Sequence, residues 1–182
     1  LDDRDFDYGR VLNNLGGLYR VMGQYEKAEP LLIQANENFK KIYGETHPIY
    51  AKSLQNLGVL YQNMGQYEKA ELLLLHVIDI ETSVLGVNHS NYGASLYSLF
   101  SLYETMGQYK KAIPLLIQCN KITLQSLRNS FTVFSEKEQR NYLDNNGLIE
   151  LNNSFLYNFR KDSYALPVET FNIQILLKYL YL

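Results

Sequence analysis

Cys119 is the one side chain of the sequence that could act as a thiol nucleophile. Such a nucleophile needs a neighbouring base or positive charge that lowers the pKa of the thiol. Cys119 instead stands at the position that Ala35 and Val77 occupy in two similar segments, and free cysteine behaves as a small apolar residue in protein cores. We therefore expect Cys119 to pack in the core, and a single cysteine cannot form an internal disulfide.

Two histidines, His47 and His89, stand 42 residues apart in similar loops and could bind a metal ion or titrate near neutral pH. Pro48 follows His47, and proline suits the first position of a helix. We therefore expect both histidines to mark helix starts.

Four acidic residues near the first residue could bind a cation: Asp2, Asp3, Asp5 and Asp7. They lack the glycine and the glutamate of a calcium loop, so we expect a solvated segment. The sequence contains no H-E-x-x-H, no pair of C-x-x-C motifs, no glycine-rich phosphate loop and no G-x-S-x-G. We predict no catalytic residue, no metal site and no cofactor, and hence a protein that is not an enzyme.

The sequence contains an internal repeat. Residues 22–29 recur unchanged as residues 64–71 and, with small changes, as residues 106–113. The step between corresponding glycines is 65 − 23 = 42 and then 107 − 65 = 42. A fixed period of this size indicates a solenoid built from one supersecondary unit.

Each period contains two helical patterns. The first is an apolar stripe at steps of three and four residues, formed in the first repeat by Leu12, Leu15, Tyr19 and Met22. Gly23 and its counterparts then suit a left-handed residue that ends the helix. A second stripe follows, with Tyr25, Ala28, Leu32, Ala35, Phe39 and Ile42. Pro30 and Pro114 fall within the second helices, near their starts, where we expect them to be tolerated.

These residues resemble the tetratricopeptide repeat (TPR), and the longer 42-residue period is similar to the kinesin light chain type. In repeat one the consensus is met by Leu15, Gly16, Tyr19, Gly23, Tyr25, Ala28, Leu32 and Ala35. The resemblance implies an all-α, right-handed α-solenoid of helix hairpins. We predict a TPR array over residues 1–127, with repeats at 8–43, 50–85 and 92–127, and a C-terminal helical extension over residues 128–182.

The resemblance also implies a concave groove lined by the first helix of each repeat. Candidate peptide-binding residues are the groove positions off the apolar stripe: Arg10, Asn13, Asn14, Gly17, Arg20, Lys52, Gln55, Asn56, Gln62, Tyr97 and Ser98. In the family such asparagines hold peptides, a role that the match carries to Asn14 and Asn56, because a carboxamide can both donate to and accept from a peptide backbone. The basic residues would favour an acidic peptide. A hydrated polar surface without a ligand is the alternative.

From residue 128 the period fails. Ser135 and Glu138 form a capping box, and further helices are expected near residues 148–160 and from residue 168. This segment resembles the stretch that joins such repeats to a CHAT domain, which is caspase-like. The resemblance implies an alternative function, the sensor part of a protease whose catalytic domain lies beyond residue 182. Residues 168–182 are apolar nearly all round, which predicts self-association of this chain or contact with a further domain. Residues 1–7 correspond to an inter-repeat loop, so a preceding repeat is expected.

Composition limits the functional classes. The chain has 182 residues and a net charge of −2, so no basic stripe favours a nucleic acid, and no apolar run approaches the roughly 20 residues that cross a membrane. We predict a cytoplasmic scaffold that binds a protein or peptide partner.

Overall fold

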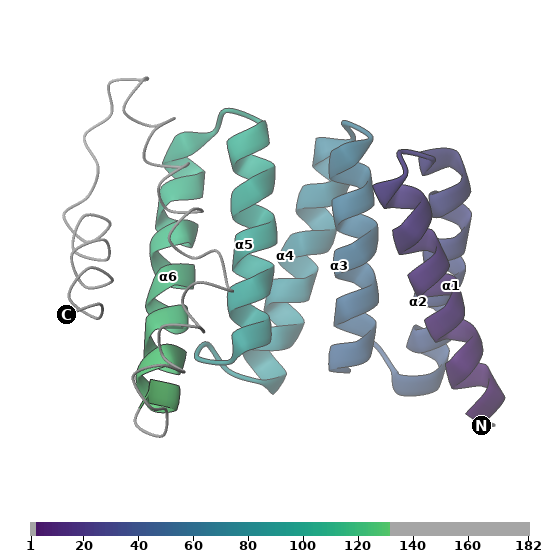
Figure 1. Ribbon diagram of the computed structural model, residues 1–182, viewed down its shortest axis with the longest axis horizontal. Coiled ribbons are helices and arrows are strands. Elements are labelled where there is room, and N and C mark those ends of the chain that lie inside the picture. Colours follow the sequence, from purple (N-terminus) through teal and green to yellow (C-terminus); the bar gives the residue numbers. More distant parts are fainter. Residues whose placement is uncertain (1–2, 132–182) are drawn as a thin grey trace. The chain divides into compact units, whose positions relative to one another are not determined.

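The computed structural model describes residues 3–131, where six helices and no strands occur (Figure 1). The predicted all-α class is confirmed. The chain divides into two compact units, Leu1–Cys119 and Asn120–Leu182, and the first is described below. The helices are α1 (Asp3–Val21), α2 (Tyr25–Tyr43), α3 (Pro48–Asn63), α4 (Tyr67–Val84), α5 (Ser90–Thr105) and α6 (Tyr109–Phe131).

Residues 1–2 and 132–182 lie outside the described part of the chain. The helices expected there, the likeness to a CHAT linker and the self-association through residues 168–182 stay predictions. The predicted domain boundary after residue 127 stays a prediction as well.

The helix boundaries follow the 42-residue period. The second helix of each pair begins at residues 25, 67 and 109, and the first helix ends at residues 21, 63 and 105. α1 departs from the period, because it begins at Asp3 whereas the counterpart of Pro48 is Phe6. The expectation of a loop over residues 1–7 is therefore wrong for residues 3–7. No proline sets the helix start there, and acidic residues suit the first turn of a helix.

Each first helix ends close to a glycine in the left-handed conformation, as the sequence predicted. Gly23, Gly65 and Gly107 have φ angles of 72°, 73° and 69°, in the left-handed region. In the second pair the Gly65 amide donates to the Gln62 carbonyl and the Gln66 amide to the Tyr61 carbonyl, at 3.0 and 2.8 Å. This is a Schellman motif, which satisfies carbonyls at the end of the helix. The second helix can then begin two residues after the glycine.

Both loop histidines cap helices, as expected. His47 Nδ1 accepts from the Ile49 amide at the start of α3, and His89 Nδ1 accepts from the Asn91 amide at the start of α5, each at 3.1 Å. Pro48 is the first residue of α3. Each imidazole thus satisfies an amide that the helix itself leaves unpaired.

Successive helices pack against one another from α1 to α5, and α3 also contacts α1 and α5. Figure 1 shows α1, α3 and α5 along one face, with α2 and α4 behind them. Small residues permit close contact within a pair: Ala28 and Ala70 are fully buried. A Cβ atom added at Gly16 would lie 2.7 Å from Leu32 Cγ, so α1 and α2 require glycine at this position.

Two residues of the stripe predicted for α1 are exposed. Leu15 and Met22 expose 38% and 56% of their surfaces, whereas Leu57 and Leu99, the counterparts of Leu15, are buried. α3 and α5 pack against a preceding helix pair, and within the described residues α1 has none. Cys119 is half-buried, at the position where Ala35 and Val77 are fully buried.

Candidate functional site

Carboxamide side chains link the helices of the α1–α3–α5 face. Asn56 Nδ2 on α3 donates to Asn13 Oδ1 on α1 at 2.9 Å. Gln55 Nε2 on α3 donates to Ser98 Oγ on α5, also at 2.9 Å. The two bonds join residues 43 apart and hold the same place in successive pairs. Four of the predicted site residues therefore meet in one polar ladder that ties the first helices together.

Two more predicted residues take part in this network. Gln62 Nε2 lies 3.2 Å from both Ser101 Oγ and Thr105 Oγ1, and Lys52 Nζ donates to Gln55 Oε1 at 2.8 Å. Gln55 exposes 5% of its surface and uses both ends of its amide inside the chain. These bonds orient the polar side chains of α3, at the cost of some of their capacity to bind a ligand.

Residues of α1 form the open part of the face. Asn14 is exposed and makes no side-chain hydrogen bond among the described residues. Gly17 and Arg20 follow at steps of three, both are half-buried, and a Cβ atom at Gly17 would meet nothing within 4 Å. Arg10 is committed to Asp7 by an exposed ion pair of 2.9 Å. Asn14 therefore keeps its amide available on the surface, and the backbone at Gly17 leaves room for at least one further atom beside it.

The α5 end of the face carries an aromatic and an acidic side chain in place of the amides and basic residues of α1 and α3. Tyr97 is half-buried, with its ring centroid 5.6 Å from that of Phe100, and burial raises the pKa of its phenol. Burial also raises the pKa of the Glu104 carboxyl, the counterpart of Arg20. The face is thus basic at Arg20 and Lys52 and acidic at Glu104.

A recurring tyrosine cluster between helix pairs was not predicted from the sequence. The Tyr103 hydroxyl on α5 donates to Glu71 Oε1 on α4 at 2.6 Å, and Lys111 Nζ reaches the same oxygen at 3.3 Å. Lys111 Nζ also lies 4.7 Å from the centroid of the Tyr103 ring. These two donors lower the pKa of Glu71, while burial and Glu71 raise the pKa of Tyr103.

The same cluster occurs one repeat earlier. Burial and the nearby Glu29 carboxylate raise the pKa of Tyr61, and Lys69 Nζ lies 5.0 Å from the centroid of the Tyr61 ring. The period contained a signal for it, because the tyrosine, lysine and glutamate all recur at 42-residue steps. The partners come from different repeats, 32 residues apart in Tyr103 and Glu71, so the pairing itself required the packed structure.

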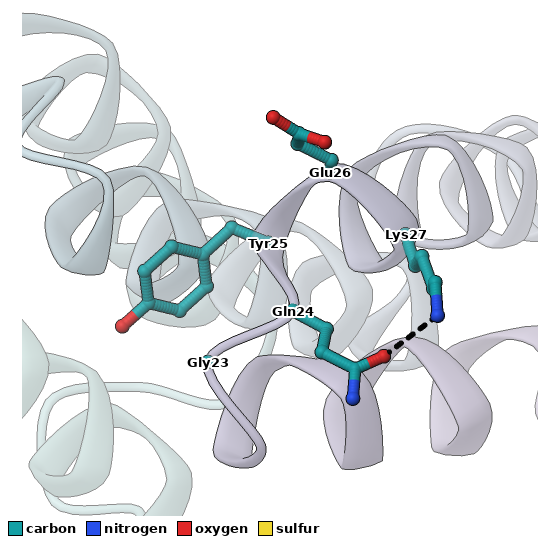
Figure 2. A pocket seen from close by; sticks show the side chains of 5 residues that line it. All are labelled: Gly23, Gln24, Tyr25, Glu26 and Lys27. Atoms are coloured by element: carbon teal, nitrogen blue, oxygen red, sulfur yellow. Dashed lines mark hydrogen bonds between the residues drawn. The ribbon is translucent and has the colours of Figure 1, made fainter.

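A shallow pocket of about 380 Å³ lies at the turn between α1 and α2, lined by residues 23–27. In Figure 2 the side chains of Gln24 and Lys27 point toward each other, joined by a bond of 2.9 Å from Lys27 Nζ to Gln24 Oε1, while Tyr25 points to the other side. The same Gly-Gln-Tyr sequence recurs at the other two turns. We interpret the pocket as part of the turn rather than as a reaction site.

The described residues offer little for other chemistry. They bring together no group of three histidine, cysteine, aspartate or glutamate side chains that could hold a metal ion. No helix among residues 3–131 combines the length and the apolar character needed to cross a membrane.

Comparison with known proteins identifies the repeat. Residues 7–80 match the family model described as Tetratricopeptide repeat, so this stretch belongs to the TPR family. A search of curated proteins gave no match.

Solved structures extend the likeness to most of the chain. The nearly identical TPR-like repeats of a Podosopora anserina protein assigned as a kinesin light chain are 26% identical, cover 94% of this chain and 84% of that chain, and superpose with a TM-score of 0.60. A variant of that protein aligns with the same values. BtubC (BKLC) from P. vanneervenii is 21% identical over 70% of this chain, with a TM-score of 0.58. The present chain covers 49% of BtubC, about half its length.

The helix pairs are therefore TPR pairs of the kinesin light chain type, arranged as an α-solenoid, and the recognition made from the 42-residue period is confirmed. TPR repeats are protein–protein interaction modules. The class of function that the fold indicates is binding to another protein.

Proposed function

We propose that the α1–α3–α5 face binds an extended peptide segment of a partner protein. The observation that carries the proposal is the open row of Asn14, Gly17 and Arg20 beside the fixed Asn56 carboxamide. An extended peptide presents backbone N–H and C=O groups in alternation, and asparagine can satisfy one of each. The ladder bond from Asn56 to Asn13 fixes the orientation of Asn56 before a ligand arrives, which reduces the entropy lost on binding.

The charges on the face favour a peptide with acidic residues. Arg20 and Lys52 supply two positive groups on α1 and α3, and Arg20 has no ion-pair partner among the described residues. Arg10 contributes less, because Asp7 already neutralises it. Glu104 at the α5 end would repel an acidic residue, so we expect the acidic part of the peptide to lie over α1 and α3. The protein would then act as a cytoplasmic scaffold.

A random dodecapeptide library displayed on phage tests the proposal with the full chain as bait. We expect the selected peptides to be enriched in aspartate and glutamate. Fluorescence anisotropy with a labelled synthetic copy should show that Asn14→Ala weakens binding about three- to ten-fold, the value of one hydrogen bond, without changing the thermal midpoint.

Gln34→Ala is the matched control, because Gln34 is an exposed carboxamide on α2, outside the α1–α3–α5 face. It should leave the affinity unchanged. Peptides that bind the Asn14→Ala variant as well as they bind the natural chain would exclude this face as the binding site.

A further inference from the structure

α1 carries a row of apolar side chains that its counterparts bury. Tyr8, Val11, Leu15 and Leu18, here called the α1 outer row, follow one another at steps of three and four residues, and each exposes between 38% and 59% of its surface. In α3 the same places hold Tyr50, Ser53, Leu57 and Leu60, and none of these exposes more than 7%. In α5 they hold Tyr92, Ser95, Leu99 and Leu102, which are also buried.

The preceding helix pair covers these places in α3 and α5. α2 packs against α3, and Asn36 Nδ2 on α2 donates to Ser53 Oγ on α3 at 2.8 Å. Glu29 on α2 lies close enough to Tyr61 on α3 to raise the pKa of its phenol, and the Tyr103 hydroxyl on α5 donates to Glu71 on α4. The contact between pairs therefore has a fixed register, in which the second helix of one pair lies on the first helix of the next.

α1 offers the same contact surface without an occupant. Tyr19 stands at the place of Tyr61 and Tyr103, with Lys27 Nζ 5.5 Å from its ring centroid. Its hydroxyl makes no hydrogen bond among the described residues. Val11 stands at the place of Ser53, so the side chain that faces it must be apolar rather than an amide such as Asn36.

We propose that the α1 outer row is the docking surface for a further repeat helix pair in the register of the array. The second helix of that pair carries a glutamate that accepts from Tyr19 and an apolar side chain that packs on Val11. This proposal does not rest on peptide binding by the α1–α3–α5 face.

A second copy of this chain fits the surface poorly. Its third pair has Ile113 at the place of Glu29 and Glu71, and isoleucine cannot accept the hydrogen bond of Tyr19. Such a head-to-tail contact would also repeat without closing and form filaments. The occupant is therefore a different repeat pair, one that retains the glutamate.

A tandem duplication supplies such a pair within the full chain. Residues 1–47 are placed before residues 6–182, with Asn36→Ile in the outer copy so that an apolar side chain faces the inner Val11. Glu29 of the outer copy then stands opposite Tyr19 of the inner copy, as it now stands opposite Tyr61. We expect a thermal midpoint at least about 3 °C above that of the 182-residue chain, and a smaller gain when Asn36 is retained.

The decisive comparison places Val11→Lys with Leu18→Lys in either copy of the duplicated chain. In the inner copy the two lysines would face the added pair, and the midpoint should fall by at least about 5 °C. In the outer copy, the matched control, the same lysines are exposed and the midpoint should not change. Equal midpoints for the two variants would show that the α1 outer row does not accept a repeat pair.

Sedimentation of the unsubstituted 182-residue chain tests the other occupant, a second copy of this chain. A concentration-dependent dimer that Val11→Lys with Leu18→Lys abolishes would assign the surface to a second copy and overturn the proposal. We expect the sedimentation of the doubly substituted chain to match that of the natural chain at every concentration.

Discussion

At the residue scale, Tyr103 connects the second and third helix pairs. Its hydroxyl donates to the Glu71 carboxylate, and this bond is the first cause of the lowered pKa of Glu71. Glu71 is partly exposed, with 24% of its side chain accessible, so solvent weakens the contribution of Lys111 more than that of the short Tyr103 bond. The tyrosine, rather than the ion pair, should therefore dominate this contact.

Tyr103→Phe should lower the free energy of unfolding by about 1 kcal/mol at neutral pH, because it removes a hydrogen bond to a charged acceptor. The pKa of Glu71 is lowered in the folded state. Its stabilisation is therefore present above the ordinary carboxyl pKa and is lost as pH falls through the lowered value. Urea unfolding at neutral pH and at about pH 3 should show the difference between natural chain and variant shrinking in acid.

Tyr92→Phe is the control for this measurement. The Tyr92 hydroxyl accepts a hydrogen bond from Gln118 Nε2 at 3.0 Å, and neither group of this pair is a carboxylate. Its loss should cost a similar free energy at both pH values. If Tyr103→Phe lowers the free energy of unfolding by the same amount in acid as at neutral pH, the charge of Glu71 does not contribute to the strength of this bond.

Glu81 presents the opposite case, a carboxylate in the core between α4 and α5. It exposes 3% of its surface, and its Oε2 atom makes no hydrogen bond. Burial raises its pKa, although the nearby Ser95 hydroxyl and the charges of Lys52 and His89 act against the shift. Its place in the repeat is that of Phe39, which is buried too, so the period indicates the burial. The influence of Ser95 on Glu81 could not be predicted, because Phe39, at the same place in the first repeat, has no polar side chain.

Glu81→Gln should change how stability depends on pH. A raised pKa in the folded state means that the contribution of Glu81 is fully present below the ordinary carboxyl pKa and is lost as pH rises through the raised value. Relative to the natural chain, we expect the variant to gain about 1 kcal/mol at about pH 8 and to gain nothing in acid. Glu68→Gln, in an exposed position of the same helix, should change stability equally little at both pH values.

At the scale of the element, helix boundaries depend on the local sequence, whereas burial and hydrogen bonding also depend on the neighbouring helix pairs. Gly65 and the stripe after it determine where α3 ends and α4 begins, because these features act within one turn of backbone. The exposure of Leu15 could not be predicted in the same way. Leu15 and Leu57 stand at the same place in their own pairs, but α3 has a preceding pair to pack against and α1 has none among the described residues. The internal bonds of Gln55 and Asn56 also depend on neighbouring pairs, so the sequence indicated a polar face but not which amides are committed.

The prolines give a prediction for α4. Pro30 is the sixth residue of α2 and Pro114 is the sixth of α6, and both helices continue past them. Leu72 is the sixth residue of α4 and exposes 70% of its surface. Leu72→Pro should therefore cost less than about 1 kcal/mol in urea unfolding, well below the roughly 3 kcal/mol typical of a helix interior.

Leu75→Pro, three residues later and also exposed, is the comparison for this substitution. It should cost the full amount, because no repeat has a proline at that place. Equal costs for the two variants would mean that the tolerance in α2 and α6 comes from their own surroundings and not from a backbone geometry shared by the second helices.

At the scale of the whole molecule, the helix pairs of the Leu1–Cys119 unit interact as neighbours along a line. α3 packs against α2 and α4 and also contacts α1 and α5, whereas the contacts of α1 are with α2 and, to a smaller extent, α3. In an array of this kind, local stability depends on the number of neighbouring interfaces. The cost of opening a helix should therefore rise from α1 to α3.

Hydrogen–deuterium exchange of the full chain, followed by mass spectrometry, measures this gradient. The amides of α3 should exchange at least about ten-fold more slowly than those of α1, because opening α3 breaks contacts on both sides, and each factor of ten corresponds to about 1.4 kcal/mol. Asn36→Ala, which removes the bond to Ser53 between the first and second pairs, should speed exchange in α1 and α2 and leave α4 unchanged. Faster exchange throughout residues 3–119 would instead show that the pairs unfold as one cooperative unit, and the nearest-neighbour account of this array would be wrong.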